Sequence, residues 1–192
     1  MTGQVPFDSY EDAGAIISVG LVNELATQHA FGRPVRPADP FAAIRQVLEI
    51  DPPSAKRLRK GDVPGFIALA RRLREVFVNL DRGDLDAAAD RLNELLAAHS
   101  AHPHLAKEDG RWRLHHHPSD AALVPMATAI CAEGMARLIG GGAASRLGTC
   151  EADDCERAFL DGSKNASRRF CSTTCQNRVK AAAFRRRQAA SR

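Results

Sequence analysis

The chain has 192 residues and a net charge of +4, and its residues are 44% hydrophobic, 26% charged and 5% aromatic. This composition is ordinary for a globular protein, and abundant alanine with few aromatic residues favours helices over sheets. No apolar run approaches the roughly 20 residues that a membrane span needs. The N-terminus lacks the basic and apolar regions of a secretory signal, so we expect a cytoplasmic protein without a membrane partner.

The first part of the chain is predicted to be helical. Apolar side chains recur around much of a helix over Ala13 to Ala30, and three prolines within residues 32–40 predict a loop after it. Asp39 followed by Pro40 is typical of a helix start, with Asp39 as the N-cap. A short helix is expected around residues 55–60.

Further helices and one hairpin are predicted before residue 140. Two amphipathic patterns cover residues 64–80 and 85–99 and predict helices of those lengths. Asp109-Gly110 lies between two short stretches, the second with alternating apolar residues, and this arrangement predicts a small β-hairpin. Ser119 and Asp120 are expected to cap a helix that ends near residue 139.

A run of three glycines at residues 140–142 is the best linker in the sequence, because the composition changes just after it. We therefore predict a mainly α protein with two units. Residues 1–144 are expected to form a helical bundle with one small hairpin. Residues 145–192 are expected to form a small four-cysteine zinc finger that ends in a basic helix.

The cysteine spacing in the second unit predicts a metal site. Cys150 and Cys155 have four residues between them, Cys171 and Cys175 have three, and fifteen residues separate the two pairs. Two short-spaced pairs at about this separation are typical of a tetrahedral four-cysteine zinc site. Four protein ligands leave no open position for water, so the zinc ion would be structural. Two disulfides, four ordinary buried thiols and an iron–sulfur cluster are the alternatives.

The fifth cysteine, Cys131, lies among apolar residues of the helix predicted over 120–139, and we interpret it as a small core residue. The second unit itself has few apolar residues, and units of this size usually need a metal or disulfides for stability. Zinc binding would then contribute directly to folding.

Positive charge is concentrated in the second unit. Residues 145–192 contain eleven Lys or Arg and five Asp or Glu, whereas residues 1–144 contain sixteen and eighteen. From Gly162 onward there are nine basic residues and no acidic residue. Ser172-Thr173-Thr174 can cap a helix that contains Cys175 in its first turn. Such an asymmetry indicates a basic unit that meets a polyanion.

The second unit resembles the CGNR zinc-finger family. The resemblance rests on Ser167-Arg168-Arg169-Phe170-Cys171 and on Cys175-Gln176-Asn177-Arg178, where Gln176 replaces the glycine of the family motif. A glycine with positive φ could not be replaced without strain, but a helical position would accept glutamine. In that family the finger follows a mostly helical domain called ABATE, to which residues 10–140 are more weakly similar. Its members are described as stress-induced transcription regulators of bacteria.

The resemblance implies a transcription regulator whose finger binds duplex DNA. The basic residues would contact phosphates, and Gln176 or Asn177 could reach base edges, although Asn177 could equally brace the finger. The candidate nucleic-acid-binding residues are Lys164, Arg168, Arg169, Gln176, Asn177, Arg178, Lys180, Arg185, Arg186 and Arg187. RNA binding by the same finger is the alternative, but few aromatic residues are available for stacking.

Two further functions concern the helical unit. An enzyme is disfavoured, because three consecutive histidines at 115–117 cannot all converge on one site from a strand, and the chain has no nucleophile or phosphate-loop motif. A role in sensing a small-molecule effector, or in forming a homodimer, would suit the two-part architecture.

Overall fold

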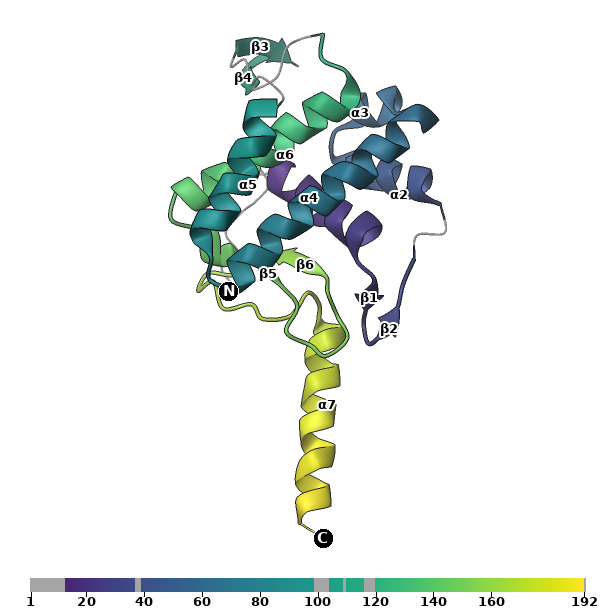
Figure 1. Cartoon of the computed structure of the whole chain (residues 1–192), viewed down its shortest axis with the longest axis vertical. Coiled ribbons are helices and arrows are strands. Elements are labelled where there is room, and N and C mark those ends of the chain that lie inside the picture. Colours follow the sequence, from purple (N-terminus) through teal and green to yellow (C-terminus); the bar gives the residue numbers. More distant parts are fainter. Residues whose placement is uncertain (1–12, 37–38, 99–103, 109, 116–119, 192) are drawn as a thin grey trace.

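The protein is mainly helical, and a single helix projects from a compact body of packed helices (Figure 1). The computed structural model describes residues 13–36, 39–98, 104–108, 110–115 and 120–191. In chain order the elements are α1 (Ala13–Leu21), the π-helix η2 (Val22–Ala26), β1 (His29–Ala30), β2 (Arg33–Pro34), α2 (Pro40–Val47), η3 (Leu48–Ile50), α3 (Pro52–Arg57), η4 (Lys60–Asp62), α4 (Val63–Asp81), α5 (Leu85–Ala98), β3 (His104–Glu108), β4 (Arg111–His115), α6 (Leu123–Gly140), η5 (Ala144–Arg146), β5 (Leu147–Thr149), β6 (Ala158–Leu160) and α7 (Thr173–Ala190).

The first helix ends earlier than predicted, because the chain turns into a hairpin. The helical segment stops at Ala26 instead of Ala30, and β1 pairs with β2 in antiparallel register. The two turn residues, Phe31 and Gly32, have φ values of 56° and 85°. Positive φ at both positions is what a two-residue type I′ turn requires. The predicted loop over 32–40 therefore contains a strand.

Several other local predictions can be compared with the structure. The short helix expected around residues 55–60 lies earlier, at Pro52–Arg57. The Oδ1 atom of Asp39 accepts hydrogen bonds from the Phe41 and Ala42 amides at 2.9 and 3.2 Å, so Asp39 is the N-cap of α2. β3 and β4 form the predicted hairpin. The capping prediction for Asp120 is wrong, because Ala122 is the N-cap of α6 and its side chain makes no capping bond; Ser119 lies outside the described residues.

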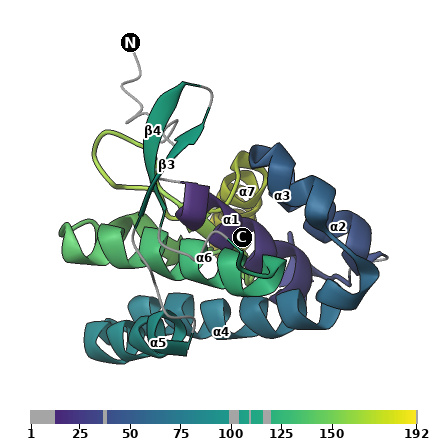
Figure 2. The same ribbon diagram turned by 90° about the horizontal axis from the view of Figure 1, so that it is seen from above.

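The core lies between α1, α4, α5 and α6, and α6 packs against both α1 and α5 (Figure 2). Among the described residues, α6 is also long and apolar enough to cross a membrane by length and composition. Half of that apolar window is buried inside the fold, as expected for a core helix. The largest fully buried apolar side chains in this core are Leu21, Val22, Ile44, Leu48, Phe66, Leu73, Val76, Phe77, Leu92, Leu95 and Met135.

Two glycines allow α1 and α6 to approach closely. A methyl group on Gly134 would lie 2.8 Å from the backbone nitrogen of Ala15 and 2.9 Å from the Cα atom of Gly14. A methyl group on Gly14 would in turn collide with the carbonyl oxygen of Ile130. Because backbone atoms cannot rotate away as a side chain can, only glycine fits at this crossing.

The second unit packs directly on the body. Leu147 of β5 and Ala158 of β6 belong to the same buried core as the helices. The buried Asn23 side chain of η2 makes two hydrogen bonds to Ala158, donating to its carbonyl at 3.0 Å and accepting from its amide at 2.8 Å. The glycines predicted as a linker end α6, and the Gly141 amide donates to the Arg137 carbonyl at 2.8 Å. The metal-site segment therefore begins on a strand that the body holds in place.

The close helix crossing generates a stability prediction. Gly134→Ala should lower the free energy of unfolding by about 3 kcal/mol, because overpacking a rigid contact forces backbone shifts. Gly140→Ala is the matched control in the same helix, since a methyl group there would meet no atom within 4 Å. Chemical denaturation followed by circular dichroism measures both variants. Equal stabilities of the two variants would contradict the conclusion that only glycine fits where α1 and α6 cross.

Candidate metal centre and nucleic-acid interface

The four predicted cysteine ligands converge at one point. Their sulfur atoms all lie within 4.8 Å of one another. The Sγ atom of Cys155 is 3.8 Å from that of Cys171 and 3.6 Å from that of Cys175, and the Cys171–Cys175 separation is 3.8 Å. A tetrahedral zinc ion with bonds of about 2.3 Å places its sulfur ligands about 3.8 Å apart. The four-cysteine cluster therefore fits one structural zinc ion, as the sequence predicted.

Two different backbone structures hold the cysteine pairs. Cys150 follows β5, and its amide donates to the Arg157 carbonyl at 2.9 Å, which closes the first knuckle. Within this knuckle Asp154 has a φ of 53°, so the chain turns sharply between the two cysteines. Cys175 lies in the first turn of α7, where the Ser172 hydroxyl accepts the Cys175 amide at 3.3 Å. The predicted cap of this helix is confirmed.

Amide hydrogen bonds support the sulfur ligands. Burial raises the pKa of the Cys155 thiol, but hydrogen bonds from the amides of Phe31 and Arg157 reverse this effect, and the pKa falls below its ordinary value. Such bonds stabilise the thiolate that a zinc ion requires. Phe31 belongs to the β1–β2 turn of the body, so the body contributes directly to the environment of a ligand.

Cys131 is separate from the metal centre. Its side chain is fully buried in the helical core, and burial raises the pKa of its thiol to about 12. A thiol with such a pKa stays protonated and unreactive at neutral pH. The interpretation of Cys131 as a core residue is consistent with this environment.

A buried carboxylate organises the loop between the two cysteine pairs. Asp161 is 1% exposed, and its two carboxylate oxygens accept the amides of Ser163 and Arg168, each at 2.7 Å. Burial alone would raise the pKa of Asp161, but these hydrogen bonds and the nearby Arg146 lower it below its ordinary value. The Arg146 guanidinium also donates to the Asp161 carbonyl at 2.9 Å. Sequence reasoning missed Asp161, because an isolated aspartate carries no pattern.

Three of the predicted DNA-contacting arginines are engaged within the protein. The Arg168 guanidinium donates to the Phe170 carbonyl at 2.8 Å and also to the Cys171 carbonyl. Arg169 forms an ion pair with Glu151. The Arg178 guanidinium donates to the Asp153 carbonyl at 2.7 Å and approaches the Cys175 sulfur at 3.8 Å. The contacts of Arg169 and Arg178 join the second half of the finger to the first.

The remaining predicted residues are differently placed. Gln176 lies in α7, a helical position that accepts a side chain without strain. All of the remaining candidates are exposed, and none of their side chains has a partner within the described part of the chain: Lys164, Gln176, Asn177, Lys180, Arg185, Arg186 and Arg187. Figure 1 shows the helix that carries all of these except Lys164 projecting away from the body, with its C-terminal end free.

The base of α7 borders a groove of about 530 Å³ on the surface of the finger. Arg169 and Phe170 line the groove on the loop side, and Gln176 and Lys180 line it on the helix side. The groove therefore brings together candidate residues from both halves of the finger.

The histidines do not form a second metal site in the described residues, where the cysteine cluster is the one group of His, Cys, Asp or Glu close enough to hold an ion. His115 ends β4, and His116 and His117 lie outside the described residues.

Zinc stoichiometry tests the metal centre. The full chain is expected to bind one zinc ion, and Cys171→Ser should lose it because three thiolates hold zinc far less tightly than four. Cys131→Ala is the matched control and should keep the full zinc content. Elemental analysis of the purified proteins gives the ratio. Zinc retained in Cys171→Ser, or lost in Cys131→Ala, would contradict the assignment.

The position of Arg178 generates a second prediction. Arg178→Gln should accelerate the transfer of zinc to a coloured chelator by about tenfold, because groups that surround metal ligands typically change affinity by that amount or more. Lys180→Gln, one half-turn away on the exposed surface, should leave the transfer rate unchanged. Equal rates in the two variants would show that Arg178 does not brace the metal site.

Comparisons with known proteins agree with the two-part arrangement. Residues 36–142 match the ABATE family model, described as "Putative stress-induced transcription regulator". Residues 146–188 match the model of the CGNR zinc finger. A search of curated proteins finds no match. Because the first match covers more than half of the 192 residues, the chain belongs to the ABATE family of transcription regulators, and it carries a CGNR zinc finger at its C-terminal end.

Proposed function

We propose that the finger binds duplex DNA and that the protein regulates transcription by this means. The observation that carries the proposal is the acid-free helix α7, whose exposed Lys180, Arg185, Arg186 and Arg187 have no ion-pair partner among the described residues. Exposed, unpaired cations release counterions from DNA when they contact phosphates, which is the main source of affinity in such complexes.

The dimensions of α7 also suit duplex DNA. Eighteen residues at about 1.5 Å each give a length of about 27 Å. A helix fits into the major groove, which is about 12 Å wide. Gln176 and Asn177 are exposed near the start of the helix, where an amide side chain could pair with an adenine edge. Positioning of the helix would depend on zinc, because Cys175 anchors its first turn.

The contacts of the other three arginines assign them a different role in this proposal. Arg168, Arg169 and Arg178 brace the finger, and they reach DNA only where their remaining donors face the groove beside α7. RNA binding is the alternative. Phe184 is 54% exposed within the arginine-rich part of α7, but a single exposed ring gives a weak platform for stacking bases.

The proposal predicts how α7 variants bind DNA. Arg185→Gln combined with Arg186→Gln should weaken binding to all duplex sequences alike, and should reduce the slope of log affinity against log salt by about 2. Arg45→Gln is the control, since Arg45 is an exposed arginine on α2 in the body. Fluorescence anisotropy with a labelled duplex gives affinities at several salt concentrations.

Two further measurements complete this test. Removal of zinc with a chelator should abolish duplex binding, and a competition with RNA of the same length should leave the duplex bound. An unchanged salt slope in the double variant, or duplex binding that survives zinc removal, would contradict the proposal. Preferential displacement by RNA would favour the alternative.

A further inference from the structure

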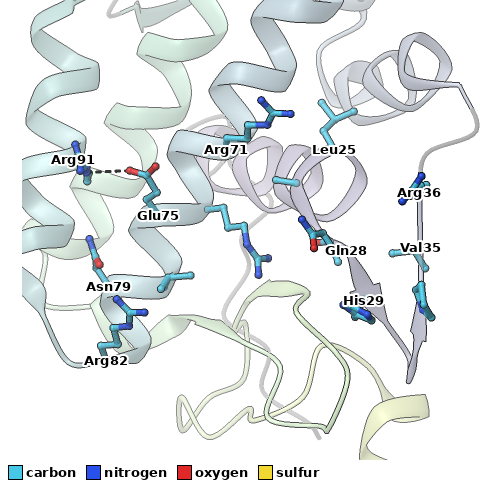
Figure 3. Close-up of a pocket in the computed structure, with 15 residues that line it drawn as sticks. Leu25, Gln28, His29, Val35, Arg36, Arg71, Glu75, Asn79, Arg82 and Arg91 are labelled. Atoms are coloured by element: carbon cyan, nitrogen blue, oxygen red, sulfur yellow. Dashed lines mark ion pairs between the residues drawn. The ribbon is translucent and has the colours of Figure 1, made fainter.

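An arginine-rich cleft lies on the body, between α4 and the segment that runs from η2 through the β1–β2 hairpin (Figure 3). Its volume is about 920 Å³. Figure 3 shows Arg71, Glu75 and Asn79 projecting from α4 on one side, and Gln28 and His29 on the other. The lining contains five arginines and apolar side chains that include Leu25, Val35 and Val78.

The charge of the cleft is not balanced. Five arginines and one glutamate line it, a formal charge of +4. Arg91 forms an ion pair with Glu75 at 3.1 Å, and Arg74 forms one with Glu156 at 3.3 Å. The other three arginines, at positions 36, 71 and 82, have no acidic partner within the described residues. This excess positive charge lies on a body whose first 144 residues contain more acidic than basic side chains.

We propose that this cleft binds a small organic anion with a doubly charged head group, of which a phosphate monoester is the prototype, and that the β1–β2 hairpin transmits its binding to the zinc finger. Arginine suits such a head group because its planar guanidinium donates two parallel hydrogen bonds to phosphate or carboxylate oxygens. The second half of the proposal rests on the proposed DNA binding, whereas the first half does not.

The shape of the site favours a small ligand over a DNA backbone. The cleft is concave, and Leu25, Val35 and Val78 give it apolar walls beside the arginines. A small organic anion would offer an apolar part to these side chains and a charged head group to the arginines. A DNA phosphate would bring no apolar group to cover these walls.

The hairpin connects the cleft with the first cysteine knuckle through several hydrogen bonds. One oxygen of the Glu156 carboxylate accepts the amides of Gln28 and His29 at 2.8 and 3.3 Å, and the Glu156 amide donates to the His29 carbonyl at 2.9 Å. Gln28 and His29 also line the cleft. Glu156 directly follows the zinc ligand Cys155 and forms the ion pair with Arg74 of the cleft.

The turn of the hairpin reaches the metal site itself. The Gly32 amide donates to the Asp154 carbonyl at 3.0 Å, and the Phe31 amide donates to the Cys155 sulfur. The Arg178 guanidinium lies so close to Gly32 that a methyl group on this glycine would collide with it. A bound anion that displaces the hairpin would therefore shift the position of a zinc ligand and of the first turns of α7. Packed elements of this kind move as units.

The binding half is tested with phenyl phosphate, whose ring and dianionic head match the two kinds of lining. Calorimetric titration of the zinc-bound full chain at constant ionic strength should detect binding of phenyl phosphate. Inorganic phosphate should bind more weakly, because it has no apolar part. Arg71→Gln combined with Arg82→Gln should lower the affinity for phenyl phosphate by about tenfold or more. Arg45→Gln, which removes an arginine outside the cleft, should bind as the unchanged protein does.

Three outcomes would contradict the proposed site. These are no binding of phenyl phosphate, an equal loss of affinity for it in Arg45→Gln, or an unchanged affinity in the Arg71→Gln, Arg82→Gln variant. Amide chemical shifts of the full chain provide a second measurement that does not depend on the variants. They should change over residues 25–36 and 71–82 on titration. Chemical-shift changes confined to α7 would show that phenyl phosphate binds α7 and not the cleft. This result would also contradict the proposed site.

The regulatory half is tested by measuring duplex affinity with and without saturating phenyl phosphate. We expect a change of about fivefold or more, within the usual range for coupled sites, and no change in the Arg71→Gln, Arg82→Gln variant. A change that persists in this variant would be direct competition on α7 and would overturn the coupling. Weaker duplex binding by this variant in the absence of phenyl phosphate, as large as that caused by the α7 substitutions, would identify the cleft as a DNA contact.

Discussion

Convergence of four sulfur atoms within 4.8 Å constrains the path of the whole chain from β5 to the start of α7. The cluster around them contains little else that could hold it together. Besides the cysteines, Ala152 is its one buried apolar residue, and Phe31, Phe170 and Val179 are only partly buried. Leu147 and Ala158 lie in the core of the body, but burial of so little apolar surface around the cysteines cannot offset the entropy of ordering the loops that carry them. A structural zinc ion can, since such ions contribute about 10–16 kcal/mol in small zinc-binding units.

The sequence was sufficient for features that depend on spacing. Cysteine separations predicted the metal centre, helical periodicity predicted α4 and α5, and Asp39 before Pro40 predicted a capped helix. It was insufficient where a contact joins distant positions. The pairing of Asn23 with Ala158 spans 135 residues, and no local pattern of asparagine in a helix indicates such a partner. The β1–β2 turn was missed because Phe31 occupies a position at which asparagine or glycine is the usual signal.

Charge counts also do not show which basic side chains make contacts within the folded protein. Arginines look alike in a sequence, and the interpretation as DNA contacts applied equally to Arg168, Arg178 and Arg185. In the folded protein, their partners separate them into two groups. Arg168 and Arg178 donate to carbonyls of the finger, whereas Lys180 and Arg185 extend from an exposed helix. Only the three-dimensional structure distinguishes a guanidinium that braces a fold from one that remains available to a ligand.

The projection of α7 from the body has a consequence for the thermodynamics of the helix. An isolated helix has a costly nucleus, because forming its first turn fixes several residues for one hydrogen bond. Here Cys175 and the Ser172 cap fix that first turn in advance. The zinc site thus acts as a helix nucleus, and only propagation is left to the arginine-rich remainder. Repulsion between neighbouring guanidinium groups opposes propagation, so neutralisation by an anionic partner would stabilise the end of the helix that lies far from the metal.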